Sequence, residues 1–257
     1  MVTVCPLWLY YSTSRWGATR MLTRRALGVA ALLIQLVAAY LEYCAAHNIT
    51  LRLTVYKGTL YELQCKEFMT QYLHCHQLVR VGGAYDNGVD IIGKWNLRQY
   101  KAKLPKTKVK PPLTSLLHHE KELDQVLVIA QCKNVGTKIG AKVVRELAGI
   151  YEYNLKRAPK TLRTNYMFLF SPHPLSDQGM KQWNTTDVPM VHVQLRVGSD
   201  ALAHCTGIHM NRLAVKQLTG LGLEAEFAGL LDTRQPLTPP ALSEASVEAA
   251  IAKLSLK

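Results

Sequence analysis

The chain has 257 residues, 48% of them hydrophobic, and its 31 Lys and Arg against 18 Asp and Glu give a formal net charge of +13. This suffices to bury the core of one sizeable domain or of two small ones, and it excludes a chain without a core. The positive excess favours an anionic partner, a nucleic acid or an acidic membrane face, with ordinary solubility charge as the alternative.

The N-terminal segment contains no acid before Glu42. Its arginines are Arg15, Arg20, Arg24 and Arg25. A basic, hydroxylated, acid-free leader is typical of a mitochondrial presequence. The apolar run 26–41 that follows would measure about 24 Å as a helix, short of a bilayer core of about 30 Å. We therefore expect residues 1–46 to be a mitochondrial, matrix-directing segment without stable membrane insertion; a membrane anchor and a secretory signal are the alternatives.

A helix and two short strands are predicted next. Apolar residues recur every three to five positions over 60–78, which indicates a helix. Residues 80–85 and 89–95 have the apolar character of strands. Asp86-Asn87-Gly88 between them favours a hairpin turn, because Asn-Gly accepts the positive φ that a tight turn needs.

A basic loop is predicted over residues 98–124. Its first part, 98–112, carries six positive charges, no negative charge and three prolines. We expect its lysines to contact a DNA backbone, because neutralised phosphates release counterions. A solvated loop without a ligand is the equal alternative. These lysines are Lys101, Lys103, Lys106, Lys108 and Lys110.

The rest of the chain alternates strands and helices. The continuous apolar run 126–131 is typical of a strand covered on both faces. The elements predicted after it are a helix over 140–155, a strand over 165–171, a short helix over 176–183, a strand over 188–195 and a partly helical segment over 207–231. This order predicts an α/β domain over 47–231, with a mixed sheet flanked by helices and a flexible tail at 232–257.

Polar residues interrupt two of these apolar strands. Asp90 heads one, and Gln131 and Lys133 end the next, pointing to the same side because side chains alternate along a strand. If the strands are neighbours, the three side chains converge. Carboxylate and amide oxygens suit Mg²⁺, with Mn²⁺ as the alternative, and a lysine beside them can hold a water. These groups are the ones needed for metal-assisted phosphodiester hydrolysis, although a solvated strand end would also explain Lys133.

The pattern G-G-x-x-D-x-G-V-D-I, then a strand ending Q-x-K, then a helix carrying VVRELAG, resembles the PD-(D/E)xK nuclease superfamily. It is most similar to the branch of Mrr-type restriction endonuclease domains. Together with the leader and the helix GTLYELQCKEFM, it resembles the required for respiratory growth protein 7 family of fungal mitochondria, over about residues 57–195. The resemblance implies a restriction-endonuclease-like fold and a need in respiration.

The resemblance also implies roles for four residues. Asp90 matches the first metal-binding acid, Gln131 the second, and Lys133 the motif lysine. Glu62, in the first helix, matches an acid that approaches the metal. The departure is Gln131, because an amide supplies a neutral oxygen and weakens metal affinity. Two functions are therefore expected: a Mg²⁺-dependent DNA endonuclease of mitochondria, with a homodimer as one form, or a nucleic-acid-binding module without turnover.

Other polar groups have a structural interpretation beside the functional one. Asp86 fits a turn better than a metal site, and Arg145 and Glu146 fit an exposed helical pair as well as a contact to DNA or to the site. The six cysteines, none in C-x-x-C spacing, predict reduced thiols. His74-Cys75-His76 and His118-His119 lack a second pair at zinc-site spacing, so core or surface histidines are the preferred interpretation.

Overall fold

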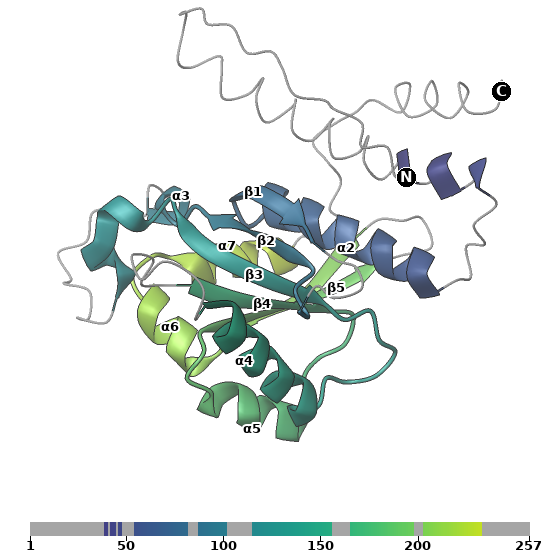
Figure 1. The fold of residues 1–257 in the computed structure, drawn as a ribbon. Helices are drawn as coiled ribbons and strands as arrows, with labels where there is room; N and C mark the ends of the chain where they lie inside the picture. The colour runs from purple at the N-terminus through teal and green to yellow at the C-terminus, as the bar shows by residue number, and fades with distance from the viewer. Residues whose placement is uncertain are drawn as a thin grey trace, which may run out of the picture.

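The computed structural model describes residues 39–40, 42–44, 46–47, 54–81, 87–101, 115–155, 165–197 and 203–232 (Figure 1). Most of the predicted leader 1–46 lies outside these ranges, as does the predicted tail 232–257 after its first residue. Asp86 also lies outside them, together with most of the predicted basic loop, including Lys103, Lys106, Lys108 and Lys110. The predictions for those residues stay predictions.

The described elements follow the predicted alternation. The helices are α2 (Thr54–Gln71), α3 (Arg98–Lys101), the 3₁₀ helix η1 (Leu116–Glu122), α4 (Ala141–Leu155), α5 (Asp177–Thr185), α6 (Arg212–Leu218) and α7 (Leu223–Asp232). The strands are β1 (Cys75–Arg80), β2 (Ile91–Trp95), β3 (Val126–Cys132), β4 (Asn165–Ser171), β5 (Met190–Val197) and β6 (Ala203–Met210).

The strands form one six-stranded mixed sheet in the order β1-β2-β3-β4-β5-β6. β1, β2 and β3 are antiparallel neighbours, β3, β4 and β5 run parallel, and β6 is antiparallel to β5. The parallel strands need crossover connections, which α4 and α5 provide. The carboxyl end of β3 therefore lies beside the head of β2 and beside the parallel end of β4.

Helices cover both faces of the sheet, which confirms the predicted α/β class. α4 and α5 pack on one face through Val144, Leu147 and Trp183 (Figure 1). α2, α6 and α7 pack on the other, where Phe68 of α2 lies edge-on to Phe170 of β4, with ring centroids 6.3 Å apart. Because β3 and β4 are buried on both faces, their sequences are continuously apolar, as predicted.

The first helix and strand lie earlier in the chain than predicted. The helix spans Thr54–Gln71 instead of 60–78, and the chain turns at His74, whose φ of 53° is left-handed. β1 then occupies Cys75–Arg80, where its alternating burial reflects pairing with β2. The strand predicted at 80–85 was wrong at its start, because Arg80 ends β1 instead of beginning a strand; residues 82–86 lie outside the described ranges.

Asn87 and Gly88, predicted as part of a hairpin turn, lie before β2; Asp86 and the rest of the strand predicted before it lie outside the described residues, so the hairpin stays a prediction. Asn87 and Gly88 both have positive φ, 54° and 76°, as a tight hairpin turn requires. A Cβ on Gly88 would lie only 2.5 Å from the Cδ1 atom of Ile150 in α4. Gly88 is therefore packed against α4, and a side chain there would have to displace the tip of Ile150 and hold a positive φ, which glycine does without strain.

Two further predictions were wrong in detail. The end of β6 was predicted as part of a mixed, partly helical segment from 207. The apolar alternation of AHCTGIHM shifts at Thr206-Gly207, where the register with β5 also shifts, and pairing with β5 makes it a strand. The basic loop was predicted to begin at 98, yet residues 98–101 form α3. The reason is Tyr100, which is 1% exposed and packs edge-on against Trp95.

Candidate functional site

Asp90 lies where β2 begins and where β3 ends. Its N–H donates to the carbonyl of Ala130 at 3.0 Å, and its Oδ2 atom accepts the N–H of Cys132 at 2.6 Å. The next residue, Ile91, pairs with Ala130. The carboxylate thus replaces the ladder carbonyl that the shorter β2 does not supply. Asp90 has a structural role in addition to any role in binding.

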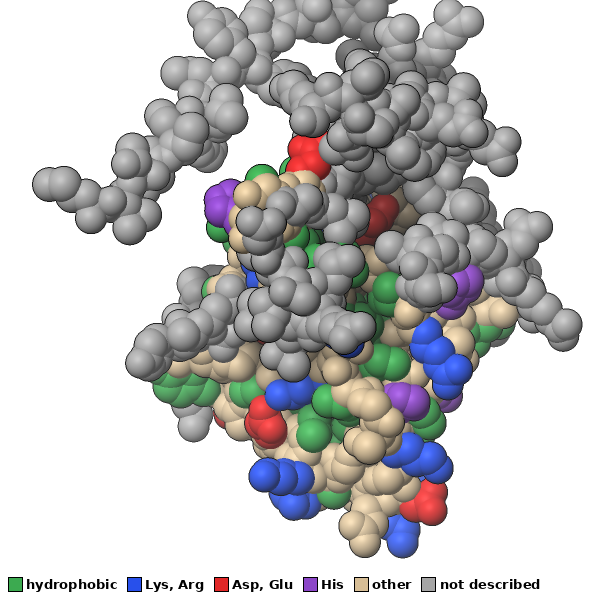
Figure 2. Space-filling model, turned by 90° about the vertical axis from the view of Figure 1, so that its right-hand side faces the viewer, with side chains coloured by type: hydrophobic (Ala, Val, Ile, Leu, Met, Phe, Trp, Pro, Cys, Tyr) green, Lys and Arg blue, Asp and Glu red, His purple; other side chains and the backbone are tan. Residues whose placement is uncertain are grey.

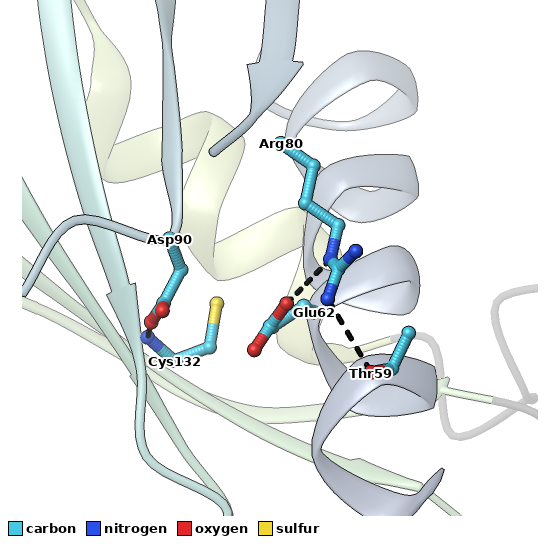
Figure 3. Close-up of polar contacts among 5 residues, drawn as sticks. All are labelled: Thr59, Glu62, Arg80, Asp90 and Cys132. Carbon is cyan, nitrogen blue, oxygen red and sulfur yellow. Dashed lines mark hydrogen bonds and ion pairs between the residues drawn. The ribbon is translucent and has the colours of Figure 1, made fainter. Parts of the chain in front are cut away.

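Glu62 approaches the same end of β3 from α2. Its Oε2 atom forms an ion pair of 2.5 Å with Nε of Arg80, whose Nη2 atom donates to the Thr59 hydroxyl at 3.3 Å. Figure 3 shows the Asp90 and Glu62 carboxylates on either side of the Cys132 thiol. The two acids therefore meet at one end of β3, as a pair contributed by β2 and α2.

The thiols beneath these acids are unreactive. Burial raises the pKa of Cys132 well above its usual value, and its hydrogen bond with Cys65 and the nearby carboxylates of Asp90 and Glu62 raise the pKa further. Burial also raises the pKa of Cys65. Because the thiolate is the nucleophile, neither cysteine suits covalent catalysis. This agrees with the predicted reduced thiols, and all five cysteines that the structure describes are free.

Gln131 is 5% exposed and faces α4. Its Nε2 atom would be 3.6 Å from a Cβ on Gly88, and its Oε1 atom has no hydrogen-bond partner among the described residues. An unsatisfied buried carbonyl oxygen is costly, so a water or a cation is expected there. Gln131 therefore presents a neutral oxygen at this strand end, and its role as a metal ligand stays a prediction.

Lys133 also turns to α4. Its Nζ atom lies 3.1 Å from Oε1 of Glu146, with the two side chains 27% and 44% exposed. Cys132, between Gln131 and Lys133, packs against the core on the α2 side. The four predicted residues therefore meet at the end of β3 as two pairs, Glu62 with Asp90 towards α2, and Gln131 with Lys133 towards α4.

The donor atoms of the site are of the chemical type that a hard cation prefers. Two carboxylates and an amide offer only oxygen, which Mg²⁺ and Mn²⁺ prefer. Within the described part of the chain, no group of three or more His, Cys, Asp and Glu is placed to hold a metal ion. Glu62 and Asp90 approach the end of β3 from the α2 side and Gln131 from the α4 side, so the three donors would have to meet past the strand end to hold one metal. Arg80 and the Cys132 N–H would share the two carboxylates with it.

Sequence reasoning missed Arg80, Thr59 and the Cys65–Cys132 contact. Arg80 carries a weak signal, a single cation at the end of an apolar stretch just before Gly82-Gly83. The thiol contact carries none, because Cys65 and Cys132 are far apart in the chain. Glu146, for which an exposed helical position and a place at DNA or the site were expected equally, is the partner of Lys133.

Basic residues are spread over the described part of one face of the molecule. On the face drawn in Figure 2, Lys and Arg side chains lie at several separate points, interspersed with acidic, histidine and apolar side chains. Of the predicted DNA-binding lysines only Lys101 is described; it lines a shallow pocket with Arg98, Lys121 and Leu123. In the portion of the chain that is described, no helix has the length and apolar character needed to cross a membrane.

The similarity to known proteins covers most of the described helices and strands. The family model described as Required for respiratory growth protein 7 matches residues 53–225, from α2 into α7. Three relatives carry the name Required for respiratory growth protein 7, mitochondrial. The Zygosaccharomyces rouxii protein is 26% identical over 211 residues, covering 72% of this chain and 86% of the relative. The Kluyveromyces lactis protein is 29% identical, covering 60% and 70%.

The third relative, from Eremothecium gossypii, is 29% identical over 177 residues, which cover 63% of this chain and 72% of the relative. No solved structure matches the chain significantly.

Proposed function

The chain belongs to the required for respiratory growth protein 7 family and is a mitochondrial protein, and from this premise we propose that it is a metal-dependent nuclease acting on mitochondrial DNA. The observation that carries the proposal is the meeting of Asp90, Gln131, Lys133 and Glu62 at one end of β3. Acid, amide and lysine at adjacent strand ends have the order and spacing of the PD-(D/E)xK pattern. Maintenance of mitochondrial DNA would link this activity to respiratory growth.

Each residue has a role in this reaction. Asp90, Gln131 and Glu62 would hold the metal, which supplies Lewis-acid polarisation of a phosphoryl oxygen and a more acidic bound water. Lys133 would orient the attacking water and offset negative charge that develops on the phosphate. Glu146, 3.1 Å from Lys133, would limit the lysine to one position.

A second candidate is a nucleic-acid-binding module that does not cleave. It is favoured by the partners that the acids already have: Arg80 on Glu62 and the Cys132 N–H on Asp90. Gln131 contributes no charge. With both carboxylates engaged and the third donor neutral, such a site would bind a divalent cation weakly.

One experiment separates the two candidates. The purified full chain is incubated with labelled duplex, branched and single-stranded DNA and with RNA, in Mg²⁺, Mn²⁺ or EDTA. The nuclease proposal expects cleavage that EDTA abolishes and that an Asp90→Asn, Lys133→Ala double variant, purified identically, lacks. Binding without cleavage of any substrate supports the binding module instead. The mass of the chain in solution, measured with and without DNA, tests the homodimer expected for cutting both strands.

A further inference from the structure

Arg80 is held in a fixed position beside the candidate site. It ends β1, pairs with Ile91 in the sheet, and its guanidinium is bound by Glu62 and Thr59, both on α2 (Figure 3). Its side chain is still 32% exposed. A guanidinium has five N–H donors in a rigid fork, and the bonds to Glu62 and Thr59 use Nε and Nη2. Arg80 is therefore pre-positioned with further donors for a ligand.

A second cation lies next to it. Lys66 is one helical turn after Glu62 on α2, so the two side chains share a face of the helix. Burial lowers the pKa of Lys66, and the positive charge of Arg80 lowers it further. Among the described residues Lys66 forms no ion pair. Glu62 is thus engaged by Arg80, and the neighbouring Lys66 keeps its ammonium donors for an anion.

We propose that Arg80 and Lys66 form a subsite for a phosphate group of a nucleic-acid backbone, next to the Asp90 end of β3. The ligand class rests on the proposed function, but the subsite requires binding only and not cleavage. Arginine suits phosphate because its planar fork donates two parallel hydrogen bonds, and lysine adds a point charge. Glu62 then has a positioning role, because it aims the guanidinium.

The alternative is an ion pair that serves the fold alone. Such pairs at partly exposed positions contribute little to stability. The two interpretations differ in what a charge-preserving change does. Arg80→Lys keeps the attraction to Glu62 but loses the fork, so a phosphate subsite is weakened while an ion pair of the fold is largely kept.

The test measures binding of a short labelled DNA duplex by the full chain, by fluorescence anisotropy over a range of salt concentrations without divalent metal. The variants are Arg80→Gln, Arg80→Lys and Lys66→Gln. Matched controls remove the same charges on α6, as Arg212→Gln and Lys216→Gln. Both lie beyond Met210, which pairs with Val191 near the start of β5, at the opposite end of the parallel strands.

We expect Arg80→Gln and Lys66→Gln each to weaken binding about tenfold and to lower the log–log salt slope by about 0.9, the value for one lost phosphate contact. Arg80→Lys should keep the slope but lose part of the affinity. The α6 controls should change both quantities less. Lys66→Gln leaves no carboxylate unpaired among the described residues, so it tests the subsite even if Arg80→Gln destabilises the fold.

The remaining outcomes are decisive. Equal effects of the site variants and the α6 controls overturn the subsite, even if the wild type cleaves DNA and the proposed function stands. Binding that depends on Arg80 and Lys66 without any cleavage supports the subsite and removes the nuclease activity. A wild-type chain that binds no nucleic acid overturns both.

Discussion

At the residue scale, Asp90 serves both the sheet and the candidate site. The Asp90 carboxylate accepts the Cys132 N–H at 2.6 Å. Asp90→Asn keeps an oxygen for this hydrogen bond but removes the charge. Because Gln131 is already neutral, we expect Mg²⁺ affinity to fall sharply and cleavage to fall at least about 10²-fold, the scale of a positioned catalytic group. Calorimetric Mg²⁺ titration and a cleavage assay measure this.

The control for that change is Asp124→Asn, which removes a carboxylate just before the opposite end of β3. It should leave both quantities near wild type. The free energy of unfolding should fall by only about 1 kcal/mol in Asp90→Asn, because a charge-assisted hydrogen bond becomes a neutral one. Undiminished cleavage by Asp90→Asn would remove Asp90 from the site.

The role proposed for Lys133 is in the chemistry rather than in the fold. Its ion pair with Glu146 is partly exposed, so Lys133→Ala should change stability by less than about 1 kcal/mol. Metal binding should persist, whereas kcat should fall at least about 10²-fold because water positioning and charge stabilisation are lost. Single-turnover cleavage rates test this against Lys138→Ala, an exposed lysine on the following loop. Equal cleavage rates in Lys133→Ala and Lys138→Ala would contradict the role proposed for Lys133.

Sequence could predict Asp90, Gln131 and Lys133 because a polar residue at the end of an apolar strand is visible in one dimension. Their arrangement as pairs on opposite sides of β3 was not visible, since it depends on which helix covers each face. Arg80 was missed because its role arises from Glu62, which reaches it across the fold. The positions of the candidate residues at the strand ends could thus be predicted from the sequence, and their side-chain partners could not.

At the element scale, β4 and β5 share a buried polar contact. The Ser171 hydroxyl donates to the carbonyl of His173 at 2.7 Å, so the Nε2–H of His192 donates to Ser171 at 2.8 Å. The Nδ1 atom then carries no proton, and it is buried without a partner among the described residues. Burial, together with a smaller effect of the His209 charge on β6, lowers the pKa of His192 to about 3.

This depressed pKa predicts acid sensitivity. The unfolded chain takes up the proton near pH 6.5, whereas folded His192 does so only near pH 3. The contribution to stability is therefore complete above about pH 6.5 and is lost by about 1.4 kcal/mol per pH unit as the pH falls towards 3. Denaturant unfolding over this range should show a flatter dependence in His192→Gln. The exposed His118→Gln should keep the wild-type slope, and identical slopes in all three proteins would contradict the prediction.

Asn211 ties three elements together. Its Oδ1 atom accepts N–H groups of Met190 and Ala214, and its Nδ2 atom donates to carbonyls of Trp183 and Val188. It is fully buried and caps α6. Asn211→Ala should therefore destabilise the fold by on the order of 3 kcal/mol, since a cap is lost and buried groups are left unpaired. Denaturant unfolding measures this, with the exposed Asn134→Ala as a control expected within about 0.5 kcal/mol of wild type.

Elements differed in how far sequence could predict them. The central strands were predicted well because burial on both faces makes them continuously apolar. The edge strands β1 and β6 were misplaced or missed, because each is paired on one side only and half exposed. Pairing with a neighbour makes them strands, and a single segment does not encode its neighbour.

At the scale of the whole molecule, the chain carries a net charge of +13, and the described Lys and Arg side chains on the face drawn in Figure 2 lie at separate points rather than in one patch. The candidate site itself is nearly balanced, because Glu62, Asp90 and Glu146 face Arg80, Lys66 and Lys133. Association with a polyanion would then depend on cations outside the site. The predicted basic loop is the largest such group along the chain.

The basic loop should accordingly set the non-specific affinity of the molecule. Its described start already gathers Arg98, Lys101 and Lys121 around one shallow pocket. We expect simultaneous change of the five loop lysines to Gln to weaken duplex DNA binding and to lower the log–log salt slope by up to about 0.9 for each lost contact. The five are Lys101, Lys103, Lys106, Lys108 and Lys110.

Anisotropy titrations of the full chain at several salt concentrations measure this. Lys181→Gln with Lys216→Gln removes exposed charges on α5 and α6 and serves as the control. Because the loop lysines lie outside the site, the cleavage rate at saturating DNA should stay near wild type while the apparent affinity falls. A salt slope that the loop changes leave intact would show that the loop only connects α3 to η1.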